Sequence, residues 1–262
     1  MKNIVLIRHG ESLGQTAHQR AQHRKDPSLI DCFLSPKGIR QAKQLGQQLL
    51  DDDSTQFDLV CVSPLTRALT TCMLGLGHLL QEYDEEEVAV SAESVDADNS
   101  ATTTPPPFIC HPGLAETGGI PENHGRPISV VVSDIKKKLK LHAPHARTKI
   151  SQVDFSLLDP QQEGGIPWPP SRHDEKLTRL DFLRWLNDRP EQNIAIVCHY
   201  NVIMALLRYQ IDHVPNSVPI ACVMREGDLD SLYIAGHESM EDPPFVVTSP
   251  GTRRKRKKKS KR

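Results

Sequence analysis

Short apolar runs alternate with helical patterns along most of the chain. Three of these runs have the length and composition of strands buried on both faces of a parallel sheet: residues 3–8, 58–62 and 193–198. A helical pattern follows each run, and strands that alternate with helices are typical of a sheet covered on both faces. The pattern therefore predicts an α/β fold, a three-layer α/β/α sandwich with a mostly parallel sheet.

Two Ser-Pro pairs indicate where helices begin. Ser35 can cap a helix whose first position is Pro36, and apolar residues recur at helical spacing from 39 to 49. The same pair at residues 63–64 predicts a helix over about 65–80. Serine accepts from the free backbone N–H groups of a first helical turn, and proline has no N–H to leave unpaired.

The second half of the chain carries two more helical patterns and a closing hairpin. Leucines at helical spacing mark a helix over about 177–189, which Pro190 ends, and another helix is predicted over about 201–210. Residues 222–225 and 229–234 are predicted to pair as a hairpin across the turn at Gly227.

Composition separates one catalytic domain, residues 1–240, from less regular segments. Residues 82–107 begin acidic, become rich in Ser, Thr, Asp and Ala, and end in three prolines, which predicts a disordered insertion. Residues 143–172 are predicted to form a loop-rich insertion. Residues 241–262 are predicted to form a flexible polybasic tail.

The net charge of −1 conceals an uneven distribution. Residues 252–262 hold nine of the 32 Lys and Arg residues and no acidic residue, so the remainder, with 23 basic and 33 acidic residues, carries a charge near −10. A basic run such as 253–262 can bind a polyanion or a nuclear import receptor. We therefore expect a cytoplasmic or nuclear protein, or one found in both places.

The cysteines and the apolar runs exclude several classes of protein. The six cysteines form no Cys-x-x-Cys pair, which argues against a zinc or redox site and favours buried, reduced thiols. Apolar runs stay well short of the roughly 18 residues that a membrane span needs. The first strand pattern starts at residue 3, so we expect no signal peptide and no transmembrane segment.

Histidines and arginines gather where the predicted strands end. Arg8 and His9 end the first strand, Arg67 follows the second in the first turn of its helix, and His199 follows the third. In open α/β sheets, ligands bind beyond the carboxyl ends of the strands. Guanidinium groups and helix N-termini both favour a phosphate there, so this set of side chains predicts a phosphate site.

The same residues resemble the motifs of the histidine phosphatase superfamily, the phosphoglycerate mutase-like fold. The matching pieces, in order, are Arg8-His9-Gly10-Glu11-Ser12, residues 34–42, residues 63–71 and Ile196-Val197-Cys198-His199. The chain resembles the mutase and small-phosphatase branch, because the Arg-His-Gly-x-Arg-x-Pro pattern of the acid phosphatases is missing. Residues 153–158 before Trp168, and Phe182-Leu183-Arg184-Trp185-Leu186, resemble plant, fungal and algal mutase-like proteins.

The resemblance implies a two-step transfer without a metal or cofactor. Neutral His9 would attack phosphorus and form a phosphohistidine, while Arg8, Arg67 and His199 stabilise the transferring phosphoryl group. The family places its proton donor in a Leu-x-Glu segment, which here is Leu114-Ala115-Glu116. Glu116 is therefore the predicted general acid, and Glu11 is the alternative.

Two departures from the family pattern affect the substrate pocket. Gln15 stands where many members have Asn, and Tyr200-Asn201 replaces the usual Gly-Gly or Ser-Gly after the second histidine. Gln15 and Asn201 are predicted to bind substrate together with the two arginines, and Arg126 is predicted to hold its distal part. The larger side chains are expected to narrow the pocket.

Hydrolysis of a phosphomonoester is the predicted activity. The sequence leaves two substrate classes open: a phosphorylated small molecule and a phosphoprotein. Phosphoglycerate mutase-type transfer is the alternative, and nothing around Gln15 or Tyr200 indicates the groups that a mutase needs. A polyanion-binding protein with a vestigial phosphatase fold is a second alternative, suggested by residues 253–262.

Overall fold

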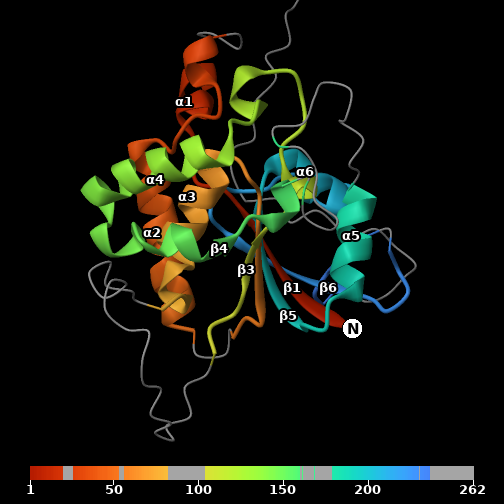
Figure 1. Ribbon diagram of the computed structural model, residues 1–262. Helices are drawn as coiled ribbons and strands as arrows, with labels where there is room; N and C mark the ends of the chain where they lie inside the picture. The colour runs from red at the N-terminus through yellow and green to blue at the C-terminus, as the bar shows by residue number, and fades with distance from the viewer. Residues whose placement is uncertain are drawn as a thin grey trace, which may run out of the picture.

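A single mixed sheet forms the centre of the protein. The computed structural model describes residues 1–19, 26–52, 56–81, 104–159, 161, 168, 179–229 and 231–236. Seven strands lie in the order β4-β3-β2-β5-β1-β6-β7 (Figure 1). Their bounds are β1 Lys2–Arg8, β2 Leu59–Val62, β3 Phe108–Cys110, β4 Val153–Asp154, β5 Asn193–Cys198, β6 Pro219–Met224 and β7 Tyr233–Ile234.

The first five strands are parallel and the last two are antiparallel additions at one edge. β5 pairs in parallel with both β1 and β2, β2 with β3, and β3 with β4. β6 runs antiparallel to β1, and β7 runs antiparallel to β6. The predicted mostly parallel sheet is confirmed, and so is the closing hairpin, although its second strand is only Tyr233–Ile234.

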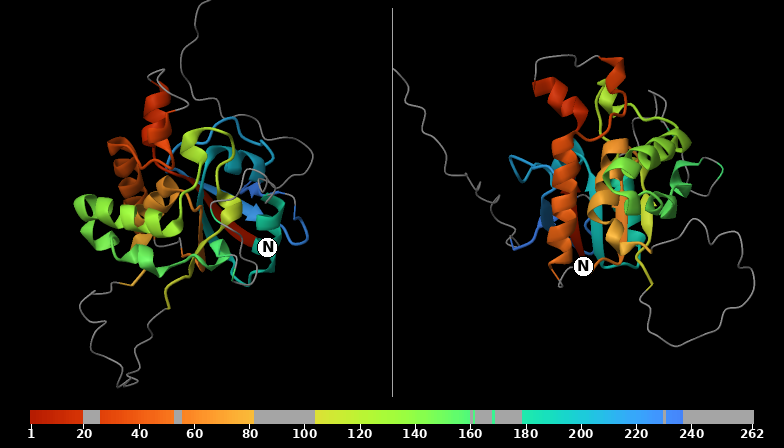
Figure 2. Two further views of the ribbon diagram at one scale, coloured as in Figure 1. Left: turned by 45° about the horizontal axis from the view of Figure 1, so that its top comes forward. Right: turned by 90° about the vertical axis from the view of Figure 1, so that its left-hand side faces the viewer.

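Helices cover both faces of this sheet, which confirms the three-layer sandwich. One face carries α2 (Pro36–Leu50), α3 (Thr66–Gly75) and α4 (Ile128–His142). The other carries α5 (Arg179–Asp188) and α6 (Tyr200–Leu206), while α1 (Leu13–Gln19) projects beyond the sheet (Figures 1 and 2). No helix among the described residues is long and apolar enough to cross a membrane.

Short 3₁₀ helices occupy several of the connections. Those described are Pro27–Leu29, Gly77–Leu79, Pro112–Leu114, Pro121–Asn123, Pro144–Ala146, Lys149–Gln152 and Ser156–Leu158. Three of them, together with β4, lie in the described part of the predicted loop-rich insertion. Most of the predicted insertion at 82–107 and all of the tail at 241–262 lie outside the described residues.

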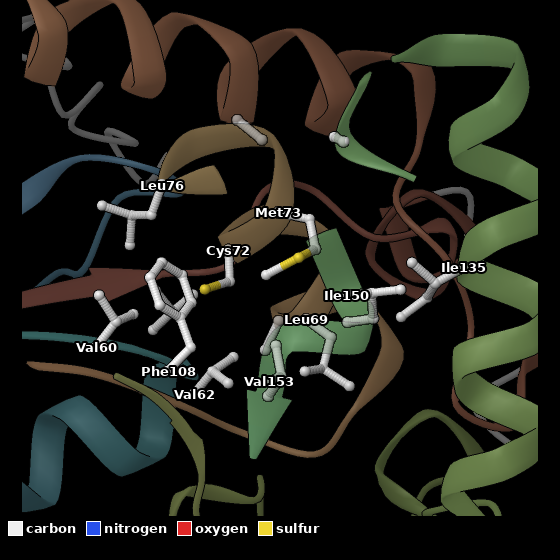
Figure 3. Close-up of a cluster of buried hydrophobic side chains, with 14 of the residues drawn as sticks. Val60, Val62, Leu69, Cys72, Met73, Leu76, Phe108, Ile135, Ile150 and Val153 are labelled. Carbon is white, nitrogen blue, oxygen red and sulfur yellow. The ribbon is translucent and has the colours of Figure 1, made fainter. Parts of the chain in front are cut away.

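Successive residues of the central strands point to opposite layers. In β2, Val60 and Val62 join the apolar cluster beneath α3 and α4, whereas Leu59 and Cys61 join the cluster beneath α5 and α6. Figure 3 shows Val60 and Val62 beside Phe108 and the helix side chains of the first cluster. This period of two explains why the strands read as continuous apolar runs, since both of their faces are buried.

The α2 start agrees with its predicted cap. Ser35 Oγ accepts a hydrogen bond from Gly38 N at 3.1 Å, and Pro36 occupies the first helical position. A residue larger than glycine would clash at position 38, because a Cβ on Gly38 would lie 2.1 Å from the carbonyl oxygen of Glu11. Gly10, which follows the candidate nucleophile His9, is equally close to its neighbours. A Cβ on Gly10 would lie 2.5 Å from Gly38 O.

The second Ser-Pro prediction was wrong about the cap. α3 begins at Thr66. Its N-cap residue, Leu65, makes no side-chain hydrogen bond that caps the helix. Asp31, distant in sequence, accepts from Thr66 N at 2.7 Å and from Thr66 Oγ1 at 2.6 Å. The helix also ends earlier than predicted, at Gly75. Ser63 does not cap α3, and its hydroxyl has a different hydrogen-bond partner in the candidate site.

Two other helices differ from the sequence prediction. α4 was not predicted, because its start contains consecutive β-branched residues of low helix propensity. Val131, Ile135 and Leu139 recur every four residues and are fully buried, so the periodic signal was present. α6 ends at Leu206 rather than near 210, because Arg208 and Tyr209 adopt φ angles of 48° and 60° that no helix accommodates.

Candidate active site

Three neighbouring parallel strands bring the predicted site residues to one edge of the sheet. β1 ends at Arg8 and is followed by His9, and β5 ends at Cys198 and is followed by His199. Because Arg8 pairs with Cys198 in register, the two histidines lie side by side. Their ring centroids are 5.0 Å apart with an interplanar angle of 56°. The structure thus joins two histidines that stand 190 positions apart in the sequence.

The contacts of His9 define which ring nitrogen carries the proton. Nδ1 lies 2.7 Å from the carbonyl oxygen of Gly10, and a carbonyl can only accept, so Nδ1 donates. Nε2 accepts from Arg67 Nε at 3.2 Å. Burial, together with the positive charges of Arg67 and Arg8, holds the pKa of His9 well below its ordinary value. His9 is therefore neutral at pH 7, with its lone pair on Nε2.

The loop that carries His9 is held on two sides. On one side it packs against the start of α2 through the glycine contact described above. On the other, Gly10 N donates to Thr71 Oγ1 at 2.9 Å, and Thr71 Oγ1 donates to Arg67 O at 2.8 Å within α3. The loop that carries the imidazole therefore contacts two helices as well as the sheet.

Arg67 is buried and its guanidinium is fully oriented. Its side chain reaches from the first turn of α3 back over the strand ends, and the residue is 2% exposed. Nη1 donates to the carbonyl oxygen of Glu122, and Nη2 donates to Asn123 Oδ1 at 2.9 Å. The 3₁₀ helix Pro121–Asn123 therefore supports the guanidinium from the side opposite His9.

Arg8 approaches the same site from β1. Its Nη1 donates to Val214 O at 2.7 Å, and its guanidinium lies 5.1 Å from the centre of the Tyr200 ring. Burial lowers the pKa of Arg8, although the nearby Glu116 carboxylate acts in the opposite direction. Tyr200, one of the departures from the family pattern, therefore forms part of the wall around this cation.

His199 is completely buried and has one free ring nitrogen. Its Nε2 lies 2.7 Å from Ser63 Oγ. Burial, Arg67 and His9 together hold the pKa of His199 well below its ordinary value. Within the described part of the chain, His199 Nδ1 and Arg8 Nε are buried without a hydrogen-bond partner. Buried polar atoms are normally paired, so these two atoms of the candidate site are candidates to bind a polar group of a substrate.

Glu116 lies at the rim of the site. Its carboxylate accepts from Thr117 N at 3.0 Å and from Asn201 N, in the first turn of α6, at 3.1 Å. The residue is only partly buried. Asn201 itself is exposed, and it contacts Glu116 through its backbone.

The alternative acid, Glu11, is fully engaged elsewhere. Its carboxylate accepts from Ser35 Oγ at 2.8 Å and from Lys37 Nζ at 3.0 Å. Burial by itself would raise the pKa of Glu11, but the hydrogen bonds from Lys37 and Ser35 outweigh it and leave that pKa below its ordinary value. A carboxyl that resists protonation is a poor proton donor.

Arg126 and Gln15 have defined but different surroundings. The Arg126 guanidinium donates to Asp31 at 3.2 Å, to Asp134 at 2.7 Å and to Thr66 Oγ1 at 3.1 Å, so its described contacts tie α3 to α4. They do not join it to the two histidines. Gln15 lies next to the site, and its Oε1 accepts from Ser12 N at 3.0 Å.

Four residues of the site region were not predicted as site residues: Asp31, Ser63, Asn123 and Asn216. Each contacts a predicted residue, or the helix that carries one, across a long sequence separation. Short polar side chains in loops are common, and no spacing rule distinguishes these four. Only the folded arrangement shows which ones meet the histidines and arginines.

The structure is an α/β fold that brings two histidines and two arginines together in a candidate anion site. Residues 4–88 match the histidine phosphatase superfamily (branch 1). The N-terminal part of the chain is thus similar to this superfamily, and most of the chain is similar to two phosphoglycerate mutase-like proteins. The resemblance read from the motifs is confirmed. These similarities support an activity of the phosphatase or mutase type.

Two curated relatives come from Arabidopsis thaliana. A phosphoglycerate mutase-like protein is 23% identical over 223 residues, which cover 79% of this chain and 73% of the relative. Phosphoglycerate mutase-like protein 2 is 25% identical over 219 residues, covering 76% of this chain and 63% of the relative. Among solved structures, the alpha-ribazole phosphatase from Shigella flexneri has a TM-score of 0.47 and 20% identity, with 88% of this chain and 94% of that chain covered.

Proposed function

We propose that this protein is a phosphatase that hydrolyses a phosphomonoester through a phosphohistidine on His9. The observation that carries the proposal is the state of the His9 ring, which is neutral and buried and has its unprotonated Nε2 facing the Arg67 guanidinium. A neutral imidazole is a nucleophile, and a guanidinium beside it binds phosphoryl oxygens.

In the first step the His9 Nε2 lone pair forms a bond to phosphorus, and the bond from phosphorus to the ester oxygen breaks. The phosphoryl charge then spreads over its outer oxygens. In this proposal Arg67 and Arg8 bind those oxygens, and so do Arg8 Nε and His199 Nδ1, two of the four buried side-chain atoms without a partner among the described residues. These groups supply the positive charge of the site, and we propose that the reaction needs no metal.

The ester oxygen leaves with a proton, which we assign to Glu116. In the second step water attacks phosphorus, the bond from nitrogen to phosphorus breaks, and the same carboxylate takes a proton from the water. Inorganic phosphate and neutral His9 are regenerated. Glu116 lies close enough to influence Arg8 electrostatically and is held by the start of α6. This position lets it face the leaving oxygen at the rim.

We favour hydrolysis over mutase-type transfer because we expect Tyr200 to narrow the substrate pocket beside Arg8. The Tyr200 ring covers the Arg8 guanidinium, where smaller residues stand in many family members. We propose a phosphorylated small molecule or a phosphoprotein as substrate, with Gln15 and Asn201 lining its site. Arg126 remains a candidate for the distal part only if its bonds to Asp31 and Asp134 open.

Trapping of the intermediate tests the proposal. The wild-type protein is mixed with ³²P-labelled phosphomonoesters, quenched in alkali, and searched for phosphohistidine by mass spectrometry. We expect label on His9, none in His9→Ala, and wild-type labelling in the matched control His142→Ala, whose side chain is exposed at the end of α4. Label retained by His9→Ala contradicts the proposal.

A second assay separates the competing activities. Release of inorganic phosphate from a panel of sugar, nucleotide, amino-acid and peptide phosphates is compared with isomerisation of phosphoglycerate. Isomerisation faster than hydrolysis would favour the mutase alternative. The basic segment 253–262 lies outside the described residues, and its contact with a polyanion or an import receptor stays a prediction. So does a cytoplasmic or nuclear location.

A further inference from the structure

The loop between α6 and β6 makes three hydrogen bonds to Arg8 and His9 at the end of β1. Arg8 Nη1 donates to Val214 O at 2.7 Å, and Ser217 N donates to Arg8 O at 2.8 Å. Asn216 Nδ2 donates to His9 O at 2.6 Å. Val214 is fully buried in the apolar cluster beneath α5 and α6, which anchors the loop. The loop thus holds both residues of the Arg8-His9 pair.

Asn216 has a second partner in the site. Its Nδ2 lies 3.3 Å from Gln15 Oε1, and the same oxygen accepts from Ser12 N at 3.0 Å. Two donors on one oxygen identify it as the carbonyl side of the Gln15 amide. Gln15 Nε2, with two N–H groups, is therefore directed away from both donors. Without Asn216, one of the two restraints on the amide would be lost.

The residue after Asn216 has a backbone conformation that needs support. Ser217 is buried with a φ angle of 53°, in the left-handed region that side chains other than Gly rarely adopt. Such conformations persist where the surroundings hold them, and they concentrate at functional sites. Here the bond from Ser217 N to Arg8 O supplies the support, and the turn directs the Asn216 amide toward His9.

We propose that Asn216 is a positioning residue for phosphoryl transfer. It fixes the peptide group of His9 and orients Gln15 so that Gln15 Nε2 donates to a phosphoryl oxygen. His9 Nδ1 is already fixed on Gly10 O, so Asn216 completes the restraint of the peptide that carries the nucleophile. The inference rests on the proposed function, because it needs His9 to be the group that accepts the phosphoryl.

Single-turnover kinetics test the role of Asn216. The rate of phosphohistidine formation is measured by rapid quench with saturating nitrophenyl phosphate, for wild type, Asn216→Ala and Asn216→Asp. A small misplacement of a reacting group can cost roughly a hundredfold in rate, and we expect a loss of about that size in Asn216→Ala. Asn187→Ala is the matched control, since Asn187 bonds only to Asp188 on α5 among the described contacts.

The aspartate variant separates hydrogen-bond donation from packing. It keeps the size of the side chain, but an ionised carboxylate can only accept, so it would face two carbonyl oxygens without a donor. We expect phosphohistidine formation in Asn216→Asp to be at least as slow as in the alanine variant. If Asn216→Ala does not fold, the aspartate variant tests the positioning role by itself. Wild-type rates in Asn216→Asp would overturn the inference.

A double-mutant cycle with Gln15→Ala tests the route of action. If Asn216 acts partly through Gln15, the loss in the double variant falls clearly short of the product of the two single losses. Fully multiplicative losses would overturn that route. A wild-type protein that forms no phosphohistidine would instead refute the proposed function. Labelled wild type with an unaffected Asn216→Ala would refute the positioning role alone.

Discussion

Ser63 Oγ lies 2.7 Å from His199 Nε2, and both residues are fully buried. Ser63 Oγ also accepts from Leu65 N at 3.3 Å, so its own proton is available to donate to His199 Nε2. When Ser63 Oγ donates in this way, the proton of His199 resides on Nδ1, an atom without a partner in the described structure. This tautomer presents a donor to the proposed phosphate site, whereas the other tautomer would present a lone pair to an anion.

Removal of the Ser63 hydroxyl is expected to slow the enzyme without displacing any charge. In Ser63→Ala the His199 tautomer is no longer selected, and a lost hydrogen bond of roughly 1 kcal/mol corresponds to about a fivefold to tenfold lower kcat/KM. The measurement is steady-state hydrolysis of nitrophenyl phosphate. Ser151→Ala, at an exposed position, is the control. An unchanged rate in Ser63→Ala would show that His199 needs no help from the serine.

Arg67 is expected to affect both rate and stability. Loss of an arginine that faces a transferring phosphoryl group costs roughly a thousandfold in rate. Arg67→Ala also removes the donor to Glu122 O and Asn123 Oδ1, and we expect about 1–3 kcal/mol lower free energy of unfolding. Activity per folded molecule and urea denaturation measure the two effects separately.

The control for Arg67 is Arg184→Ala, because the Arg184 side chain is 63% exposed and pairs only weakly along α5. Arg67→Lys adds a second comparison, since it keeps the charge but loses the planar fork of donors. A lysine variant with wild-type kcat/KM would show that charge alone is sufficient.

Glu116 is expected to matter most when the leaving group needs a proton. Glu116→Gln should slow phosphoryl transfer from alkyl phosphates far more than transfer from nitrophenyl phosphate, whose leaving group departs without protonation. The water of the second step then lacks its base, so phosphohistidine should accumulate with the activated substrate. Rapid quench measures both effects. Equal losses for the two substrates, with no accumulation, would assign the proton transfers to another carboxyl.

The depressed pKa of His9 predicts how the first step depends on pH. Protonation would remove the nucleophilic lone pair, and burial beside Arg67 and Arg8 shifts that event to a pH well below 6.5. As the pH falls through 6.5, the His9 ring should therefore stay neutral. Titration of the ring by ¹⁵N NMR, with the His9→Ala spectrum to assign the resonance, checks this directly. A midpoint near 6.5 would contradict it.

His111 makes a similar prediction for stability rather than rate. Burial lowers the pKa of His111 to about 4, although Asp181 acts in the opposite direction. Between pH 6.5 and 4 the unfolded chain binds a proton that the folded protein does not, so stability is full above 6.5 and declines as the pH falls. The contribution of this one residue is up to about 3 kcal/mol.

His111→Asn tests that contribution. His111 Nδ1 accepts from Gly113 N at 3.0 Å, and an asparagine oxygen can replace this acceptor without titrating. The ring also packs on Phe182 and Trp185, so the variant should be less stable at pH 7. The fall in melting temperature between pH 6.5 and 4 should nevertheless be smaller than in wild type. An unchanged slope would show that the pH dependence comes from groups other than His111.

The sequence by itself determined the class of fold and the chemical core of the site. Strands buried on both faces must be continuous apolar runs, so β1, β2 and β5 could be read directly. The order of strand and helix then placed His9 and His199 at one edge of a parallel sheet. α2 was equally readable, because its start, its cap and its apolar stripe are all local features.

Only the tertiary structure decided how the polar side chains are paired. Ser63 looked like a helix cap, but Asp31 caps α3 and Ser63 contacts His199 instead. Asn216 meets His9 across more than 200 positions of sequence. Such bonds depend on which loops the packed sheet and helices bring within about 3 Å of each other, and a short polar side chain carries no periodic signal of its distant partner. Periodicity reports burial and local geometry, while hydrogen bonding in a buried site is satisfied by whatever the fold places nearby.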